Sequence, residues 1–317
     1  MTTRGFVAVT DPGWYERLLE LGSRTGPMDA NFWRPSPRRV ALPPGTPFLF
    51  KLRAPHNVIA GFGYFASFSV LPDWLAWDTF GEANGVKSLE ELRAKLARIQ
   101  DGARIDADPQ GRIGCSLIAE AVFFARSEWV PAPNDWRART VTGAAYDLTN
   151  GEGLRVWNAC RERVLPDNLL SAPAPAPVTA AEPRARYGAP VTYQPRLGQG
   201  IFRVQVLDAY ARACAVTNEH SLVVLDAAHL KPYGRGGDHD VRNGISLRTD
   251  LHKLLDRGYV TVDNELRFVV GRRLKADFDN GRSYYDLHGR PVTLPAEPIH
   301  RPSIETLAWH RENIFLG

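Results

Sequence analysis

The sequence predicts an α+β fold divided between two domains, and three observations support this prediction. The chain has 317 residues, which is more than one hydrophobic core usually holds. The segment Ser171–Pro190 is rich in proline and alanine, has little to bury, and is typical of an extended linker. Residue types also change across this segment, because seven of the eight tryptophans precede it and seven of the eight histidines follow it. We therefore expect a first domain at 1–168, a linker at 169–192 and a second domain at 193–317.

The first domain is expected to combine strands and helices, with strands in the majority. Short apolar runs predict strands, and capped or amphipathic runs predict helices. The expected strands are 6–10, 46–55, 57–70 and 113–125, of which the last is either a strand pair or one bent strand. The expected helices are one that starts after Asp11 as N-cap, one at 88–100 capped by Ser88, and one at 152–165.

Two further details of the first domain follow from spacing. Gly61 and Gly63 inside one expected strand indicate a bulge or a close backbone approach. In the helix at 88–100, four apolar residues at helical spacing are expected to form one buried stripe. These residues are Leu89, Leu92, Leu96 and Ile99.

The second domain is expected to follow the order helix, strand, loop, strand, helix, hairpin. The first helix is expected at 200–217, the first strand at 221–230, and a strand that continues into a helix at 244–258. Gly258 is expected to end that helix, because glycine adopts the left-handed conformation that terminates helices. Residues 259–270 form two alternating runs around Asp263-Asn264, which predicts a hairpin.

Composition excludes several classes of protein. No apolar run reaches the roughly 18–20 residues of a membrane span, and the first residues lack the layout of a signal peptide, so we expect a cytoplasmic protein without a membrane partner. The three cysteines are widely spaced, which leaves neither a disulfide framework nor a four-cysteine zinc site. The formal net charge of +4 permits a polyanionic partner without predicting one.

Three polar residues of the second domain have a spacing that suits hydrolysis of a phosphate ester. His229 is expected at the end of a strand, Asn243 follows a glycine-rich loop, and His252 lies on the next helix. A neutral imidazole is a good general base for water near neutral pH. A histidine on a facing helix can hold a divalent cation, and the asparagine amide can bridge the loop and orient the first histidine. Taken singly, the three residues have simpler interpretations: a structural histidine, a turn residue and a helix-surface residue.

The order and spacing of these residues resemble the HNH endonuclease motif on a ββα-metal fold. On that resemblance, His229 is the first histidine, Asn243 is the asparagine and His252 is the second histidine. Many HNH proteins have an aspartate or histidine metal ligand directly before the first histidine. This chain has Ala228 there instead, so the second protein ligand is not defined by the motif.

Two aspartates are candidates for that second metal ligand. Asp226 lies three residues before His229 and reaches a cation if the strand end bends. Asp256 follows His252 by four residues, hence on the same helix face, and could equally be an ion-pair partner of Lys253. Carboxylate, imidazole, phosphate and water ligands suit Mg²⁺ or Mn²⁺, with Ni²⁺ or Co²⁺ as substitutes in vitro.

Basic residues surround the motif in sequence and are candidate contacts to DNA phosphates, although each one alone is more simply a solvated surface charge. The candidates are Lys231, Arg235, Arg248 and Lys253. Such contacts would make DNA binding weaker as the salt concentration rises. His239, within the loop, is expected to be exposed to solvent rather than catalytic.

The tryptophans of the first domain suggest how a DNA base could be recognised. A protein that takes a base out of the duplex needs aromatic walls and a few polar groups for the base edge. Stacking contributes roughly 1–3 kcal/mol per base, enough to offset the cost of unpairing. The candidate pocket residues are Trp33, Trp74, Trp77, Asn31 and Asp78. Each tryptophan taken singly is more simply a packing residue.

Nearly the whole chain resembles a bacterial group of predicted HNH restriction endonucleases. The segments that carry the resemblance include VTDPGWY, NFWRPS, AWDTFGEANG, DAAHLKPY and NGISLRTDLHKLLDRGYVTV. The N-terminal half is more loosely similar to β-barrels of the PUA superfamily, of the EVE, ASCH and YTH kind, several of which read modified bases. The resemblance implies a PUA-superfamily-like β-barrel with helices, followed by a ββα-metal (HNH) nuclease domain. It further implies a restriction enzyme that cuts double-stranded DNA containing a modified cytosine.

Other functions also fit the sequence. The chain could be a non-catalytic reader of nucleic acid whose HNH unit has decayed, or an HNH nuclease toxin whose first domain docks a protein. RNA in place of DNA as the substrate is also open. Because one active site cuts one strand, a double-strand break would need a homodimer or repeated binding.

Overall fold

The computed structural model of the protein describes residues 4–38, 41–103, 106, 108–164 and 198–317. The chain divides into two compact units, Met1–Leu197 (unit 1) and Gly198–Gly317 (unit 2). The predicted linker at 169–192 lies outside the described residues. None of the helices in the described part of the chain combines the length and the apolar character that crossing a membrane requires.

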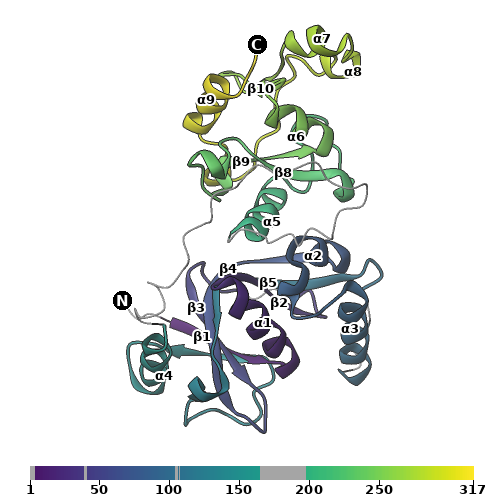
Figure 1. The fold of residues 1–317 in the computed structure, drawn as a ribbon. Coiled ribbons are helices and arrows are strands. Elements are labelled where there is room, and N and C mark those ends of the chain that lie inside the picture. Colours follow the sequence, from purple (N-terminus) through teal and green to yellow (C-terminus); the bar gives the residue numbers. More distant parts are fainter. Residues whose placement is uncertain (1–3, 39–40, 104–105, 107, 165–197) are drawn as a thin grey trace, which may run out of the picture. The chain divides into compact units, whose positions relative to one another are not determined.

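Unit 1 is built on one mixed sheet (Figure 1). Its strands are β1 (Arg4–Thr10), β2 (Met28–Arg34), β3 (Thr46–Leu52), β4 (Val58–Pro72), β5 (Arg112–Phe123), β6 (Val130–Pro131) and β7 (Gly143–Asp147). Along the sheet the order is β2-β5-β4-β3-β1-β7, with β6 paired to β4. Only the β1–β3 pairing is parallel among the pairings of the described residues.

The strand pairings of unit 1 do not form the predicted β-barrel among the described residues. A barrel closes when the two edge strands of the sheet pair with each other. Among the described residues, the path of paired strands runs from β2 to β7 without a pairing that joins those two. Unit 1 therefore shows a sheet with helices, and the β-barrel part of the prediction is not confirmed.

Two helices of unit 1 start at the predicted caps. In all, the described part of unit 1 contains the helices α1 (Pro12–Thr25), α2 (Asp73–Phe80), α3 (Leu89–Ala103) and α4 (Gly151–Glu162), with 3₁₀ turns η1 (Gly81–Asn84) and η2 (Arg126–Glu128), and the two in question are α1 and α3. The Asp11 side chain accepts from the Trp14 amide at 3.0 Å, and the Ser88 hydroxyl accepts from the Glu91 amide at 3.2 Å. The predicted stripe on α3 is wrong at Ile99, whose side chain is exposed.

Two irregular strands of unit 1 match the sequence signals. β5 is one bent strand, because Glu120 has a φ of 50° and the register with its neighbours shifts there. A Cβ atom on Gly61 of β4 would lie 2.3 Å from the carbonyl oxygen of Val122, so only glycine allows this close approach.

Unit 2 contains two small antiparallel sheets and five helices among its described residues. The strands are β8 (Leu225–His229), β9 (Gly244–Arg248), β10 (Val260–Val262) and β11 (Phe268–Val270). The helices are α5 (Gln199–Ala209), α6 (Thr249–Asp256), α7 (Arg273–Phe278), α8 (Arg282–Tyr285) and α9 (Ile304–Asn313). The 3₁₀ turns are η3 (Leu222–Val224), η4 (Tyr233–Arg235), η5 (Val241–Asn243) and η6 (Pro298–His300). β8 pairs with β9, and α6 follows β9 directly and lies beside both strands (Figure 1).

Two predicted boundaries in unit 2 are wrong for identifiable reasons. The helix predicted at 200–217 ends at Ala209, because Ala211 and Arg212 have φ angles of 52° and 57°, which a right-handed helix does not allow. The strand predicted at 221–230 begins only at Leu225, since the β-branched pair before it forms a 3₁₀ turn in which Val223 is exposed. The end of α6 near Gly258 and the β10–β11 hairpin agree with the sequence.

Candidate active site

The β8–β9 pair and α6 position the three motif residues. His229 is the last residue of β8 and pairs with Gly244, the first residue of β9. Asn243 ends the 3₁₀ turn immediately before Gly244, and His252 lies on the helix that β9 feeds. Strand pairing therefore brings the first histidine opposite the Asn-Gly pair, although thirteen residues separate them in sequence.

Asn243 ties the two ends of the intervening loop together. Its side chain is buried, with 2% of the residue exposed. Oδ1 accepts from the Lys231 amide at 2.8 Å, while Nδ2 donates to the carbonyl oxygens of Lys231 and Asp238, both at 2.9 Å. The Leu230 amide in turn donates to the Asn243 carbonyl at 2.9 Å. The segment directly after His229 is thus fixed by three hydrogen bonds to Asn243, and a fourth ties Asp238 to the same residue.

Two glycines allow this arrangement. A Cβ on Gly237 would lie 1.9 Å from the Lys231 carbonyl oxygen, so the loop can close on itself only with glycine there. A Cβ on Gly244 would lie 2.4 Å from Cγ2 of Val206 on α5. Gly244 has an ordinary extended backbone (φ −124°), so the Asn-Gly pair serves close packing against α5 rather than a left-handed turn.

The imidazole of His229 lies between an aromatic ring and a second imidazole. It stacks on Phe202 of α5 with ring centroids 3.9 Å apart and planes 14° apart. Its Nε2 lies 3.1 Å from Nδ1 of His239. His239 itself stacks on Tyr233, with ring centroids 4.8 Å apart and planes 8° apart. The expectation of a solvent-exposed His239 is therefore wrong: the loop folds it back, half-buried, onto His229.

His252 is flanked by both candidate aspartates. Nδ1 lies 3.3 Å from Oδ2 of Asp226 on β8, and Nε2 lies 3.4 Å from Oδ2 of Asp256 on α6. A neutral imidazole carries one N–H and can donate to only one of these carboxylates. The other carboxylate faces a nitrogen lone pair unless a proton or a metal ion lies between them. His252 therefore has a carboxylate oxygen near each of its two ring nitrogens.

The electrostatics of Asp226 agree with this arrangement. The hydrogen bond with His252 lowers the pKa of Asp226 below its ordinary value, against the opposing effect of partial burial. Asp226 is thus a carboxylate at neutral pH. Its side chain retains 31% of its exposure and that of Asp256 retains 52%, so both are accessible from solvent.

His252 and its two aspartates could supply only some of the ligands that a hard divalent cation needs. No group of three or more His, Cys, Asp or Glu side chains in the described ranges is arranged as a complete metal site. Mg²⁺ commonly takes only one or two protein carboxylates and completes its shell with water and phosphate oxygens. Two donors about 2.1 Å from one cation and about 90–110° apart are separated by about 3.0–3.4 Å. The spacing of His252 from each aspartate falls in that range.

The four candidate phosphate contacts have different surroundings. Arg235 and Lys253 are exposed. The Arg248 guanidinium forms a two-point ion pair with Asp250, at 3.0 Å and 2.5 Å. The Lys231 ammonium lies 5.6 Å from the centre of the Trp309 ring. Arg235 and Lys253 are consequently the two whose charges are most directly presented to a polyanion.

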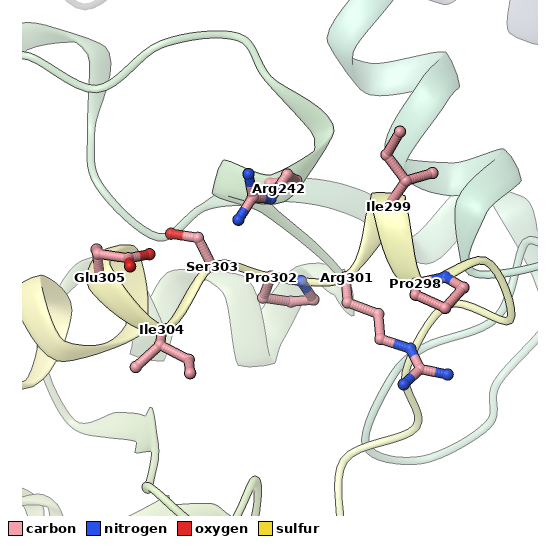
Figure 2. A pocket seen from close by; sticks show the side chains of 8 residues that line it. All are labelled: Arg242, Pro298, Ile299, Arg301, Pro302, Ser303, Ile304 and Glu305. Carbon is pink, nitrogen blue, oxygen red and sulfur yellow. The ribbon is translucent and has the colours of Figure 1, made fainter.

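A surface pocket lies beside η5, the turn that ends at Asn243. It has a volume of about 320 Å³ and is lined by Arg242, Pro298, Ile299, Arg301, Pro302, Ser303, Ile304 and Glu305. Figure 2 shows Arg242 next to the turn that carries Ser303, and the Ser303 amide donates to the Arg242 carbonyl at 2.9 Å. None of the three motif residues lines this pocket.

In unit 1 the candidate pocket residues on β2 are joined to Asn84. Asn31 is fully buried, and its Nδ2 donates to Oδ1 of Asn84 at 2.8 Å. The half-buried Trp33 donates from Nε1 to the carbonyl oxygen of Asn84 at 2.7 Å. Asn31 is therefore a buried partner of Asn84 and is not accessible at the surface, contrary to the expectation that it lines a base pocket.

The remaining candidates lie on α2. Trp74 and Trp77 are half-buried and Asp78 is exposed. The structure brings Asn31 and Trp33 together through Asn84, whose Nδ2 also donates to the carbonyl oxygen of Ala76 on α2 at 3.0 Å.

Comparison with protein families identifies unit 2. Residues 214–263 match the family model described as HNH endonuclease. The matched segment contains His229, Asn243 and His252, and it covers the whole β8–β9–α6 arrangement. Unit 2 carries an HNH endonuclease domain, and the protein is a nuclease. HNH nucleases generally use divalent metal ions.

Searches beyond this family give little more. The curated proteins contain no match to the chain. Among solved structures, the chain is similar to two mutant forms of the ZmASCH protein from Zymomonas mobilis. The identities are 12% and 13%, the TM-score is 0.31 for both, and the matches cover 48% and 50% of this chain and 96% and 98% of those chains. It is also similar to a structure described as "Modification dependent TagI restriction endonuclease", at 12% identity and a TM-score of 0.26, over 86% of this chain and 61% of that one. TM-scores this low do not establish a shared fold, so no function is taken from these likenesses.

Sequence reasoning missed two residues of the site. For Phe202 the sequence predicts only that it lies within the helix at 200–217, and for His239 it predicts exposure to solvent. A usable signal existed for His239: if Asn243 closes the loop, residues just before it must return toward the end of β8.

Proposed function

We propose that the protein is a metal-dependent DNA endonuclease, and specifically a restriction enzyme that recognises modified DNA. The observation that carries the nuclease part is the position of His229 at the end of β8, opposite Asn243-Gly244 at the start of β9, with His252 on the following helix, in the segment that matches the HNH family. The restriction part is supported by the resemblance of the sequence described above.

His229 is proposed as the general base. In the proposed reaction a water molecule loses a proton to the His229 imidazole, and its oxygen forms a new bond to the phosphorus. The bond from phosphorus to the 3′ oxygen breaks, and that oxygen takes a proton from solvent, which leaves a 5′-phosphate. Phe202 holds the face of the imidazole, and Asn243 fixes the backbone that follows it. A positioned general base contributes roughly 10²–10⁴-fold to the rate.

Asp226 and His252 are proposed to hold the cation, with Asp256 on the second nitrogen of His252. When bound, Mg²⁺ or Mn²⁺ would neutralise charge on the phosphate and on the leaving oxygen. Asp226 is the preferred ligand because it lies on the same strand as His229 and is the less exposed of the two aspartates. Asp256 then accepts from the remaining N–H of His252 and fixes its orientation, a common arrangement around metal-bound histidines.

Unit 1 is proposed to recognise a flipped, modified cytosine. Trp33, Trp74 and Trp77 are half-buried and so present ring surface for stacking, and Asp78, next to Trp77 in sequence, is exposed. We also propose that the sheet of unit 1 forms a barrel of the PUA kind. A homodimer is proposed to supply the second active site that a double-strand break needs.

The nuclease proposal is tested with supercoiled plasmid and Mg²⁺ or Mn²⁺. We expect nicking that EDTA abolishes, and a loss of at least about 10²-fold in His229→Ala. His220→Ala, which removes an exposed histidine, is the matched control and should keep parental activity. Equal activity of the parent and His229→Ala would exclude the mechanism and favour a non-catalytic reader.

The modification proposal needs matched DNAs that differ only in cytosine modification. We expect faster cleavage of the modified duplex, with the difference lost in Trp33→Ala. Equal cleavage of all duplexes by the parent would refute modified-base recognition and leave the nuclease function intact.

A further inference from the structure

The loop between β8 and η5 delivers a second imidazole to the proposed general base. His229 Nε2 and His239 Nδ1 are 3.1 Å apart, a hydrogen-bond distance for two nitrogens. One ring must donate and the other must accept. His239 therefore constrains where the single proton of a neutral His229 resides.

His239 is itself held in place from several sides. Asn243 Nδ2 donates to the carbonyl oxygen of Asp238, the residue directly before it. The Tyr233 ring stacks nearly parallel on its imidazole. At the start of α5, a Cβ on Gly198 would lie 2.8 Å from Cδ2 of His239, so the helix start packs closely against the ring. A side chain that merely pointed to solvent would need none of these contacts.

The chemistry of a general base selects one of the two hydrogen-bond directions. If His239 donated to Nε2 of His229, the proton of a neutral His229 would lie on Nδ1, and neither nitrogen could accept a proton from water. If His229 donates from Nε2, the lone pair lies on Nδ1 and the ring can act as a base. Only the second direction is compatible with catalysis by His229.

We propose that His239 is a positioning residue that accepts a hydrogen bond from Nε2–H of His229 and thereby fixes the tautomer and orientation of the general base. This inference rests on the general-base role proposed for His229. During the reaction, water gives one proton to Nδ1 of His229, and the Nε2 proton stays on His229. The hydrogen bond to His239 becomes charge-assisted as the imidazolium forms, which strengthens it.

Two substitutions separate the acceptor from the ring of His239. His239→Phe keeps a ring that can stack on Tyr233 but has no acceptor. His239→Asn loses the ring and keeps an amide oxygen near the position of Nδ1. We expect kcat to fall about 10–100-fold in His239→Phe with KM nearly unchanged, and His239→Asn to recover most of the loss. His220→Phe is the matched control for replacing a histidine by phenylalanine, and thermal denaturation checks that each variant folds.

The tautomer of His229 can be read without any cleavage assay. ¹⁵N-detected imidazole spectra of the full chain, assigned with His229→Gln, should show His229 as the Nε2–H tautomer in the parent and as a mixture in His239→Phe. A parental Nδ1–H tautomer, or a His239→Phe variant with parental kcat, would overturn the inference. Failure of the proposed general-base role alone would appear differently: His229→Ala would stay active while the tautomer of His229 in the parent is still fixed.

Discussion

A fully buried asparagine anchors a loop in each unit, and the two differ in what they hold in place. Asn84 in unit 1 donates to the carbonyl oxygens of Ala76 and Gly81, at 3.0 Å and 2.8 Å, and accepts from Asn31. Asn243 in unit 2 likewise donates to two carbonyl oxygens and accepts one hydrogen bond. Each amide makes three hydrogen bonds, so burial leaves neither without partners.

The neighbours of the two asparagines set their consequences. The carbonyl oxygen of Asn84 accepts from the Trp33 indole, so this loop positions an aromatic ring. The carbonyl oxygen of Asn243 accepts from the Leu230 amide, directly after His229, so that loop positions an imidazole. The same arrangement thus holds a tryptophan proposed for base contact in unit 1 and a histidine proposed for proton transfer in unit 2.

The largest expected effect comes from removing each anchor. Asn243→Ala and Asn84→Ala should each lower the free energy of unfolding by about 1–3 kcal/mol or more, because buried partners lose their hydrogen bonds. Asn243→Ala should also lower kcat for DNA cleavage, whereas Asn84→Ala should weaken DNA binding and leave kcat near the parental value. Denaturant titration, cleavage kinetics and equilibrium binding measure these three quantities.

The exposed Asn134→Ala is the control for this pair and should change stability by less than about 0.5 kcal/mol. The comparison breaks if Asn84→Ala lowers kcat while DNA affinity is unchanged, because unit 1 would then act on chemistry rather than on recognition.

The second-largest expected effect distinguishes the roles of the two aspartates that flank His252 in unit 2. Asp226→Asn should raise the Mg²⁺ concentration for half-maximal cleavage by about 10–100-fold, and Asp256→Asn should raise it less, because a proposed ligand is changed in the first case and an orienting group in the second. Activity measured across a Mg²⁺ titration reads this out. Asp279→Asn, at an exposed turn, is the control. A larger shift in Asp256→Asn would reverse the assignment of the two carboxylates.

The ββα part of the fold could be predicted because local and long-range signals coincide there. β9 and α6 are adjacent in sequence, glycine ends the helix near Gly258, and His229 is the last residue of its strand. The boundaries that failed depend on tertiary context. Val223 has strand propensity yet lies in an exposed 3₁₀ turn, and α5 stops where Ala211 adopts a left-handed backbone that its residue type does not predict.

The spacing indicates that the residues before Asn243 return toward the end of β8, but it does not indicate that the His239 ring reaches His229. That contact depends on the path of the loop, and that path is set by hydrogen bonds from one side chain to the backbone at Lys231 and Asp238. The sheet of unit 1 is similar: the parallel β1–β3 pairing and the order of seven strands arise from packing, not from any single strand. Residue patterns therefore predicted where the helices and strands of the ββα unit lie more reliably than which side chains touch.

A smaller effect tests whether recognition and phosphate contact are divided between the units. Trp77→Ala should weaken binding to modified DNA by about 1–3 kcal/mol without changing its salt dependence, because stacking carries no charge. Lys253→Ala should reduce the slope of log affinity against log salt by about 0.9. Binding isotherms at several salt concentrations measure both quantities. A changed slope in Trp77→Ala would contradict this division.

The smallest expected effect concerns a buried polar anchor that, unlike Asn243, can titrate. His310 on α9 is 2% exposed; its Nε2–H donates to the Leu255 carbonyl at 3.0 Å, and Nδ1 accepts from the Thr261 hydroxyl at 2.9 Å. Burial lowers the pKa of His310 below its ordinary value of 6.5, with the Leu255 hydrogen bond and the charge of Asp256 acting in the opposite direction.

The unfolded chain therefore binds a proton at His310 more readily than the folded chain does. The stabilising contribution is present above pH 6.5 and is lost as the pH falls through the lowered native pKa. Denaturant titrations of the parent at pH 7.5 and 5.5 should show this loss, and His310→Gln should show less of it because glutamine does not titrate. An equal loss in both proteins would assign the pH dependence to other groups, and His310 would then be an anchor of the same kind as Asn243.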